Sequence, residues 1–287
     1  MDSTTSVRIV LVPGFWLGAW AWDEVAELLR GQGDEVVALT LPGLEPDHPA
    51  RGDVSLDDHV AAIEAALEGD RPVLLVAHSG AAIPATVAID RHVDRIAGTV
   101  WVDTAPVVDG AAMDASFEGD AMPLDAAWDD EMEQGSMRDL TPAQLDEFRS
   151  RAVPEPGGVV REAVSLTDDR RLDVPATIVC TAFSAADYRA YAEQGMSFLA
   201  GLLEHRALTL VDLPTGHWPM WSKPVELAAT PRRASTPVTS EGAEPPRTQA
   251  PATCSRSGRA GCRRWRRPRG SRACASRRLD RRPLRRR

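Results

Sequence analysis

A serine stands at the tip of a short turn between a strand pattern and a helix pattern. Residues 73–76 form an apolar run, and the apolar positions of 83–89 repeat with helical spacing. A strand, a tight turn with a central serine and a helix make a nucleophile elbow, which lifts the hydroxyl clear of the sheet. The strained turn needs small residues two places either side of Ser79, and Ala77 and Ala81 fill them. The pattern predicts a nucleophile, with an ordinary helix-capping serine as the alternative.

A serine hydroxyl needs a general base, and His217 is the best placed of the six histidines. It follows the strand pattern of 207–213, and loops after parallel strands meet at one rim of the sheet. His78 neighbours Ser79, but adjacent side chains in a tight turn point apart, so we expect it to support the turn. The other four histidines are expected on loops or helix surfaces: His48, His59, His92 and His205.

The base in turn needs a carboxylate on its second ring nitrogen. Asp103 directly follows the strand pattern of 96–102, which places it at the correct rim. Asp187 follows the strand pattern of 176–180 by several residues, where we expect the chain to have entered a helix. We favour Asp103 and keep Asp187 as the alternative acid.

Acyl transfer also needs donors for the oxyanion. The backbone N–H of Gly80 lies at the start of the elbow helix. Gly14 lets the loop after the first central strand turn close to the site, and the Phe15 N–H is the expected second donor. We expect Trp16 and Trp218, together with Phe15, to line the substrate pocket, which favours a small apolar or aromatic substrate.

These residues require a sheet to position them. Short apolar strands alternate with amphipathic helices up to residue 102, which predicts an α/β fold: a doubly wound, mostly parallel sheet with helices on both faces. Residues 107–172 are acidic with weak periodicity, and we interpret them as a small helical lid inserted between two strands. Further strands are expected at 8–12 and 35–41. A helix is expected over 188–203, and the last helix, from Pro224, is interrupted at Pro231.

Composition divides the 287 residues into a domain at 1–230 and a tail at 231–287. The net charge of −9 conceals an acidic body and a tail with 18 Arg and three acidic residues. Cys180 is the body's only cysteine, so no disulfide framework is expected. No apolar run could span a membrane and the first residues do not resemble a signal peptide, which predicts a cytoplasmic location.

The tail contains no Lys and almost nothing apolar, so we expect it to be disordered. An arginine-rich arm for nucleic acid is one interpretation. We favour a frameshift product or unselected extension, because a GC-rich gene read out of frame gives this composition. A nucleic-acid partner is therefore not expected, and the sequence leaves the oligomeric state unknown.

Four segments in this order resemble the α/β-hydrolase fold over about residues 7–229: 11–16 (Leu-Val-Pro-Gly-Phe-Trp), 41–43 (Leu-Pro-Gly), 76–81 (Val-Ala-His-Ser-Gly-Ala) and 216–219 (Gly-His-Trp-Pro). The Trp-rich segment 15–22 is similar to the small, single-lid branch that holds esterases and hydroxynitrile lyases. The family's usual Gly-x-x-Asp acid motif is absent at 181–187, and some lipases of the fold carry their acid after the strand that follows the elbow, which favours Asp103. The resemblance implies a cofactor-free hydrolase, most often an esterase, with no metal.

The leading hypothesis is a serine hydrolase that cleaves an ester or related acyl bond of a small molecule through an acyl-enzyme. A second enzyme reading is a hydroxynitrile-lyase-like C–C lyase, which would want a lysine near the site; the only lysine, Lys223, follows His217 closely. A third reading is a hydrolase fold that binds a small ligand without catalysis.

Overall fold

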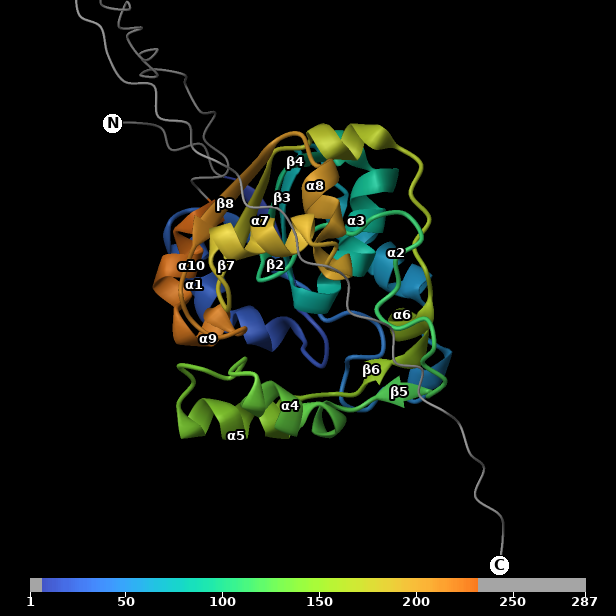
Figure 1. Ribbon diagram of the computed structural model, residues 1–287, viewed down its shortest axis with the longest axis vertical. Helices are drawn as coiled ribbons and strands as arrows, with labels where there is room; N and C mark the ends of the chain where they lie inside the picture. The colour runs from blue at the N-terminus through green and yellow to red at the C-terminus, as the bar shows by residue number, and fades with distance from the viewer. Residues whose placement is uncertain (1–6, 232–287) are drawn as a thin grey trace, which may run out of the picture. The chain divides into compact units, whose positions relative to one another are not determined.

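The computed structural model describes residues 7–231, built around one parallel sheet (Figure 1). The six strands lie in the order β2-β1-β3-β4-β7-β8, and every neighbouring pair is parallel. Their bounds are β1 Arg8–Val12, β2 Glu35–Ala38, β3 Val73–His78, β4 Ile96–Val102, β7 Ala176–Cys180 and β8 Leu208–Asp212. This is the predicted doubly wound α/β architecture, and the expected fold class is confirmed.

The central strands are the most apolar because other elements cover both of their faces. All six residues of β3 are buried, and β4 is buried except at one position. The register pairs Val76 with Val100 and His78 with Val102, so β3 and β4 end side by side. The residues that follow these two strands, Ser79 and Asp103, therefore start at the same edge of the sheet.

Helices cover both faces of the sheet. Figure 1 shows α1 and α10 together on one side and α2 and α3 on the other. A capping box between Ser55 and Asp58 starts α2, as its sequence predicts. The helices outside the insertion are α1 Asp23–Gly31, α2 Leu56–Leu67, α3 Ala82–Arg91, α7 Ala185–Glu193, α8 Ala200–Glu204, α9 Pro219–Ser222 and α10 Pro224–Ala228.

Two predicted boundaries are wrong. Strand β2 ends at Ala38 instead of residue 41, because its pairing with β1 ends at Leu11 and Ala38; the chain then turns at Pro42-Gly43, where Gly43 has φ 83°. The predicted helix over 188–203 is two helices, α7 and α8. Gly195, at φ 85°, ends α7 in a Schellman motif in which the Met196 N–H bonds the Tyr191 carbonyl.

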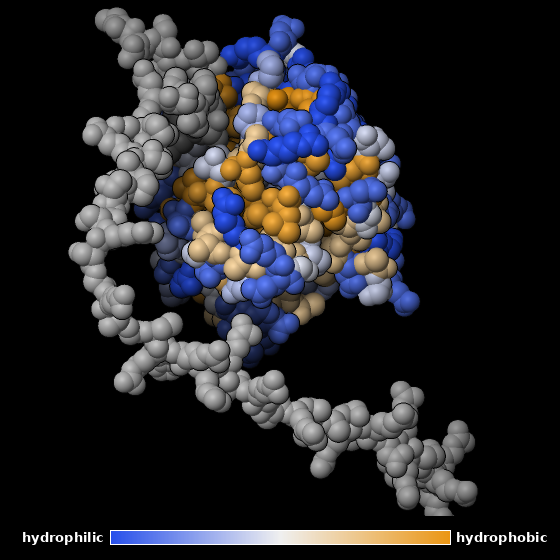
Figure 2. Space-filling view, turned by 45° about the horizontal axis from the view of Figure 1, so that its top comes forward, coloured by the Kyte–Doolittle hydropathy of each residue, from blue (hydrophilic) through white to orange (hydrophobic). Residues whose placement is uncertain are grey.

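Large apolar side chains remain exposed around these two helices. Phe183, Met196, Phe198 and Leu203 are each more than a third exposed. Figure 2 shows apolar surface gathered among polar residues on one face of the described part. The second half of the region predicted as one helix is therefore only partly covered by the rest of the domain.

The insertion, which we define as residues 103–175 between β4 and β7, takes the place of the predicted lid. It contains α4 Trp128–Glu133, α5 Pro142–Arg151 and α6 Gly157–Arg161, and a capping box of Thr141 and Gln144 starts α5 as predicted. It also contains an antiparallel ribbon of β5 Ala121–Met122 and β6 Glu155–Pro156. We call this pair the β5–β6 ribbon; strands of two residues carry no periodicity that could have predicted it.

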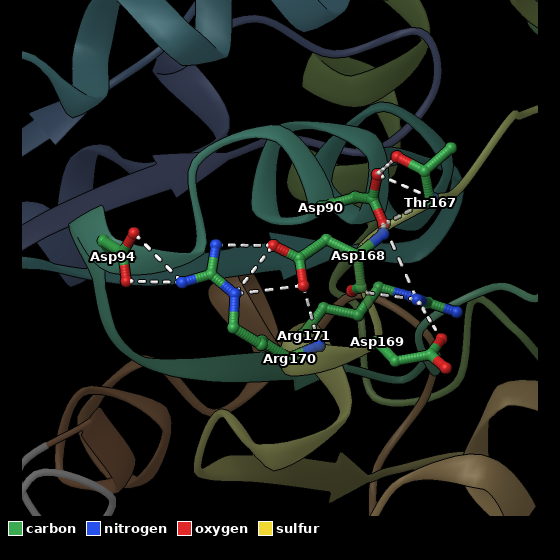
Figure 3. A network of polar contacts seen from close by, with 7 residues as sticks. All are labelled: Asp90, Asp94, Thr167, Asp168, Asp169, Arg170 and Arg171. Carbon is green, nitrogen blue, oxygen red and sulfur yellow. Dashed lines mark hydrogen bonds and ion pairs between the residues drawn. The ribbon is translucent and has the colours of Figure 1, made fainter.

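The end of the insertion is fastened to the elbow helix α3 (Figure 3). The buried carboxylate of Asp90 on α3 accepts hydrogen bonds from the backbone N–H groups of Thr167 and Asp168. Arg171 is largely buried and pairs with Asp90 at 3.5 Å, while Arg170 bridges Asp168 and Asp94. The insertion therefore returns to the sheet along the helix that follows the predicted nucleophile.

Within residues 7–231, no helix is both long and apolar enough to cross a membrane. Cys180 is a free thiol buried on β7. The predicted Arg-rich, disordered tail lies outside the described residues, except for Pro231. Helix α10 ends at Ala228, and residues 230 and 231 are again helical, so the predicted interruption at Pro231 lies at the edge of the described residues.

Candidate active site

Ser79 occupies a strained position directly after β3. Its φ is 51°, a left-handed conformation that costs free energy for any residue other than glycine. Ala77 and Ala81 are both buried, as small flanking residues must be. Gly14 approaches the turn so closely that a Cβ there would lie 2.9 Å from the Ser79 Cβ and 2.7 Å from the His78 Nδ1. The loop after β1 and the elbow are thus packed together.

His217 bridges Ser79 and Asp103. Its Nε2 lies 2.7 Å from the Ser79 Oγ, and its Nδ1 lies 2.6 Å from the Asp103 Oδ2. A carboxylate can only accept, so Nδ1 carries the proton and Nε2 presents a lone pair to the serine hydroxyl. The loop after β8 holds the ring in place, since the His217 N–H donates to the Ser136 carbonyl of the insertion at 2.7 Å.

Asp103 is buried at the end of β4 with donors around its carboxylate. Oδ1 accepts hydrogen bonds from the Thr181 N–H at 3.1 Å, the Ala182 N–H at 3.2 Å and the Tyr188 hydroxyl at 2.8 Å. Burial alone would raise its pKa, but the hydrogen bond and charge of His217 and these donors hold the pKa of Asp103 well below its usual range. Asp103 is therefore an ionised partner for the imidazole.

The same contacts change the basicity of His217. Burial lowers the pKa of His217, but the hydrogen bond to Asp103, the Asp103 charge and the Glu131 charge outweigh it, so the net direction is upward. The protonated form of His217 is therefore stabilised at this position.

The alternative acid, Asp187, lies elsewhere. Its carboxylate closes a capping box with Ser184 at the start of α7, and this exposed pair lowers the pKa of Asp187. The residue after it is the one that reaches the site, because Tyr188 is buried and donates to Asp103. Tyr188 was not among the predicted site residues, although its place in a helix next to a capping residue was visible in the sequence.

The segments that carry the two predicted oxyanion donors pack against each other next to Ser79. Gly80 is in the first helical turn after the elbow, where N–H groups have no partner within the helix. Phe15 lies in the loop after β1, and its ring packs on Gly80, where an added Cβ would come within 2.4 Å of that ring. The two segments that carry these N–H groups are in direct contact.

The two tryptophans predicted to line the pocket have different environments. Trp16 is almost fully buried and meets the Phe15 ring edge-on at 6.3 Å. Trp218 is only 1% exposed; its ring lies 4.9 Å from that of His217 and 4.6 Å from that of Phe148. It packs behind the imidazole, so the expectation that Trp218 lines an open pocket is wrong.

His78 supports the turn, as expected. It is fully buried, and its Nε2 donates to the His217 carbonyl at 2.8 Å. Burial, together with the charge of His217, lowers the pKa of His78 to about 3, so it stays neutral. His59 was expected at a surface and is buried instead; its Nε2 donates to the Pro42 carbonyl at 2.8 Å. Burial lowers the pKa of His59 to about 4.

Lys223, the residue that a lyase reading would use, makes an ion pair with Glu226 of α10 at 3.6 Å. In the part of the chain that the structure describes, no group of three or more His, Cys, Asp or Glu side chains is placed to hold a metal ion.

A parallel sheet with a strained serine on the turn between β3 and α3 is the architecture of the α/β hydrolases. The model of the Alpha/beta hydrolase family matches residues 9–230, and the chain belongs to this family. The resemblance seen in the sequence is thereby confirmed.

Several curated relatives are plant esterases. Methylesterase 8 of Arabidopsis thaliana is 34% identical over 99 residues, which cover 33% of this chain and 36% of that protein. Esterase PIR7B of Oryza sativa subsp. japonica is 34% identical over 114 residues, covering 37% and 41%. The chain thus spans about two fifths of the length of these relatives. Methylesterase 7 of Arabidopsis thaliana is 27% identical over 80% of this chain and 96% of its own.

Solved structures share the fold at low sequence identity. An extracellular α/β-hydrolase from a Paenibacillus species superposes with a TM-score of 0.61 at 20% identity, covering 79% of this chain and 98% of that one. The methylesterase protein MES16 from Arabidopsis gives 0.59 at 19% identity, covering 79% and 98%.

Proposed function

We propose that this protein is a serine hydrolase that cleaves carboxylic esters of small molecules. The observation that carries the proposal is the continuous hydrogen-bonded path from the Ser79 Oγ through His217 to Asp103. The strained φ of Ser79 and the depressed pKa of Asp103 support it, since both are features of catalytic sites. The esterase names of its relatives agree with this reaction class.

The geometry is suited to a two-step reaction. The Ser79 Oγ attacks the ester carbonyl carbon while His217 Nε2 takes the hydroxyl proton, and Asp103 stabilises the imidazolium that forms. The Phe15 and Gly80 N–H groups are the proposed donors to the oxyanion. His217 then returns the proton to the departing alkoxide, which leaves as the alcohol. Water, activated by the same imidazole, hydrolyses the acyl-enzyme.

The surroundings of Ser79 favour a small apolar or aromatic acyl group. The Phe15 and Trp16 side chains belong to the loop that packs against the elbow, and both are apolar and buried. An apolar or aromatic acyl group is the kind that such side chains accept. The pairing of Lys223 with Glu226 gives no support to the lyase reading.

The test is covalent labelling with a fluorophosphonate probe, together with hydrolysis of p-nitrophenyl acetate. We expect the wild-type protein to label and to release nitrophenol, and Ser79→Ala to do neither. Ser150→Ala is the control, because this exposed hydroxyl on α5 only bonds the Glu147 carbonyl. Labelling that persists in Ser79→Ala, or an unlabelled but folded wild-type protein, would contradict the proposal.

A further inference from the structure

The polar groups of Trp16 are all held by the insertion. The Trp16 N–H donates to the Glu155 Oε2 at 3.1 Å, and the Trp16 carbonyl accepts from the Val153 N–H at 2.9 Å. The indole Nε1–H donates to the Met122 carbonyl at 3.0 Å. All three partners belong to the β5–β6 ribbon or to the residues just before β6. The backbone needs this support, because Trp16 has a φ of 68°.

Glu155 is an unusual residue for this buried position. It is 1% exposed, and no lysine or arginine of the described residues makes an ion pair with it. Its Oε1 lies 3.9 Å from the Nδ1 of His59. His59 uses Nε2–H to bond the Pro42 carbonyl, so its Nδ1 presents a lone pair to Glu155. Burial raises the pKa of Glu155 to about 8, which makes it a neutral acid at pH 7. Its Oε2 accepts from the Trp16 N–H, and a neutral acid can do so because one carboxyl oxygen remains an acceptor.

The Trp16 N–H belongs to the peptide unit that follows Phe15, the proposed oxyanion donor. The peptide unit before Phe15 is held by Gly14, which packs against Ser79 and His78. With Glu155 holding the unit on the other side, the backbone of Phe15 is fixed from both ends. Oxyanion stabilisation depends on donors being in place before the reaction, so the direction of this N–H matters for turnover.

We propose that Glu155 is a positioning residue for the oxyanion site: by accepting the Trp16 N–H it holds the Phe15 N–H toward Ser79. The site is therefore assembled by the docked β5–β6 ribbon and not by the sheet alone. This inference deepens the proposed ester hydrolysis and rests on it. Glu155 touches neither substrate nor the reacting atoms and acts only through the loop.

Glu155→Leu tests the role, because leucine fills the apolar site without an acceptor. Glu155→Gln is the conservative rescue, since its amide oxygen can accept the same N–H. Glu162→Leu is the matched control. Glu162 also lies in the insertion, and it accepts a hydrogen bond from the backbone N–H of Leu56 at 2.9 Å, away from the loop that carries Phe15. Near-UV circular dichroism verifies the fold of each, and kcat and KM are measured with p-nitrophenyl acetate.

We expect Glu155→Leu to lower kcat by about 10- to 100-fold with KM changed less than about 3-fold. That loss is smaller than the roughly 10²- to 10³-fold loss on removing an oxyanion donor itself. Glu155→Gln should retain kcat within about 3-fold, and Glu162→Leu within about 2-fold. This pattern separates positioning from general loosening of the insertion.

Equal kcat in folded Glu155→Leu and wild type overturns the inference, and so does a Glu155→Gln as slow as Glu155→Leu. If Glu155→Leu and Glu155→Met both fail to fold while Glu155→Gln folds, the bond serves the fold and the positioning role is wrong. Each of these results leaves the proposed function standing. A wild-type protein without Ser79-dependent ester turnover overturns both proposals together.

Discussion

The Oδ2 of Asp103 lies 2.6 Å from the Nδ1 of His217, although the two residues are 114 positions apart in the chain. Asp103 directly follows β4, the strand next to the one that Ser79 follows; its φ is 48°, and its carboxylate meets the loop after β8 at His217. The proposed acid therefore follows the strand beside the elbow, whereas Asp187, after β7, caps α7.

Replacing Asp103 and Asp187 in turn should show which of the two aspartates is the acid. Asp103→Asn should lower kcat by about 10⁴-fold, by analogy with a measured Ser-His-Asp triad, because the amide no longer stabilises the required tautomer and the imidazolium. Asp187→Asn should change kcat less than about 2-fold. Steady-state hydrolysis of p-nitrophenyl acetate measures both. The reverse order of effects would make Asp187 the acid.

The pH dependence of turnover should follow His217. The general base must be neutral, so kcat/KM falls as the pH drops through the pKa of His217 in the free enzyme. Asp103 and Glu131 raise that pKa above 6.5, and His78, the other ionisable ring in contact, stays neutral. We expect the acidic limb to have its midpoint above about 6.5. A Glu131→Gln variant should move this midpoint downward; a wild-type limb below 6 would contradict the assignment.

The pH dependence of the free energy of unfolding should show the raised pKa of the buried Glu155. Its folded pKa of about 8 exceeds the usual 4.5, so the unfolded chain loses its proton first as the pH rises. The free energy of unfolding should therefore fall between pH 4.5 and 8, by up to about 1.4 kcal/mol per pH unit. His59, its ionisable neighbour, acts in the opposite sense below pH 6.5, where its lowered pKa costs stability.

The difference between wild type and Glu155→Gln removes the His59 contribution. Urea unfolding of both proteins at pH 5, 6.5 and 8 gives this difference. We expect Glu155→Gln to gain stability relative to wild type as the pH increases. A difference that does not vary with pH would show that Glu155 is ionised in the folded protein at all three pH values.

Gly14 should tolerate no side chain. A Cβ at Gly14 would lie 2.9 Å from the Ser79 Cβ and 2.7 Å from the His78 Nδ1, so Gly14→Ala must displace the elbow or the loop. We expect a loss of about 1–3 kcal/mol in the free energy of unfolding, together with a fall in kcat. Gly31→Ala is the control, because nothing lies within 4 Å and alanine favours helix. Equal effects of the two substitutions would contradict the close packing at Gly14.

The sequence predicted the parts of the site whose signals are local. The elbow is one short segment with a strand, a turn and a helix, and Asp103 follows an apolar strand directly. His59 could have been recognised as buried, because it lies on the stripe of α2 that also contains Leu56, Val60 and Ile63. The helical spacing of these residues was visible in the sequence, but His59 was predicted at the surface because it is a polar residue type.

Other features depend on contacts between distant segments and had no local signal. Glu155 looks like a surface acid in an acidic insertion, and its burial arises only where the β5–β6 ribbon meets Trp16 and His59. Trp218 was expected in the pocket because it follows His217, but the aromatic rings of the insertion and α9 draw it into the core. The proposed boundary of the hydrolase domain at residue 230 stays a prediction, as does the cytoplasmic location.

The insertion leaves the sheet at Asp103 itself and rejoins the body on α3 through Asp90. Two of its attachment points are thus the proposed acid and the helix that follows the proposed nucleophile. Exchanging the insertion for that of a relative would therefore change the proposed catalytic residues as well as the substrate specificity. Such chimaeras should be active only where the junctions lie within the insertion, between Asp103 and the residues that bond Asp90. The exchanged segment must also supply an acceptor for the Trp16 N–H.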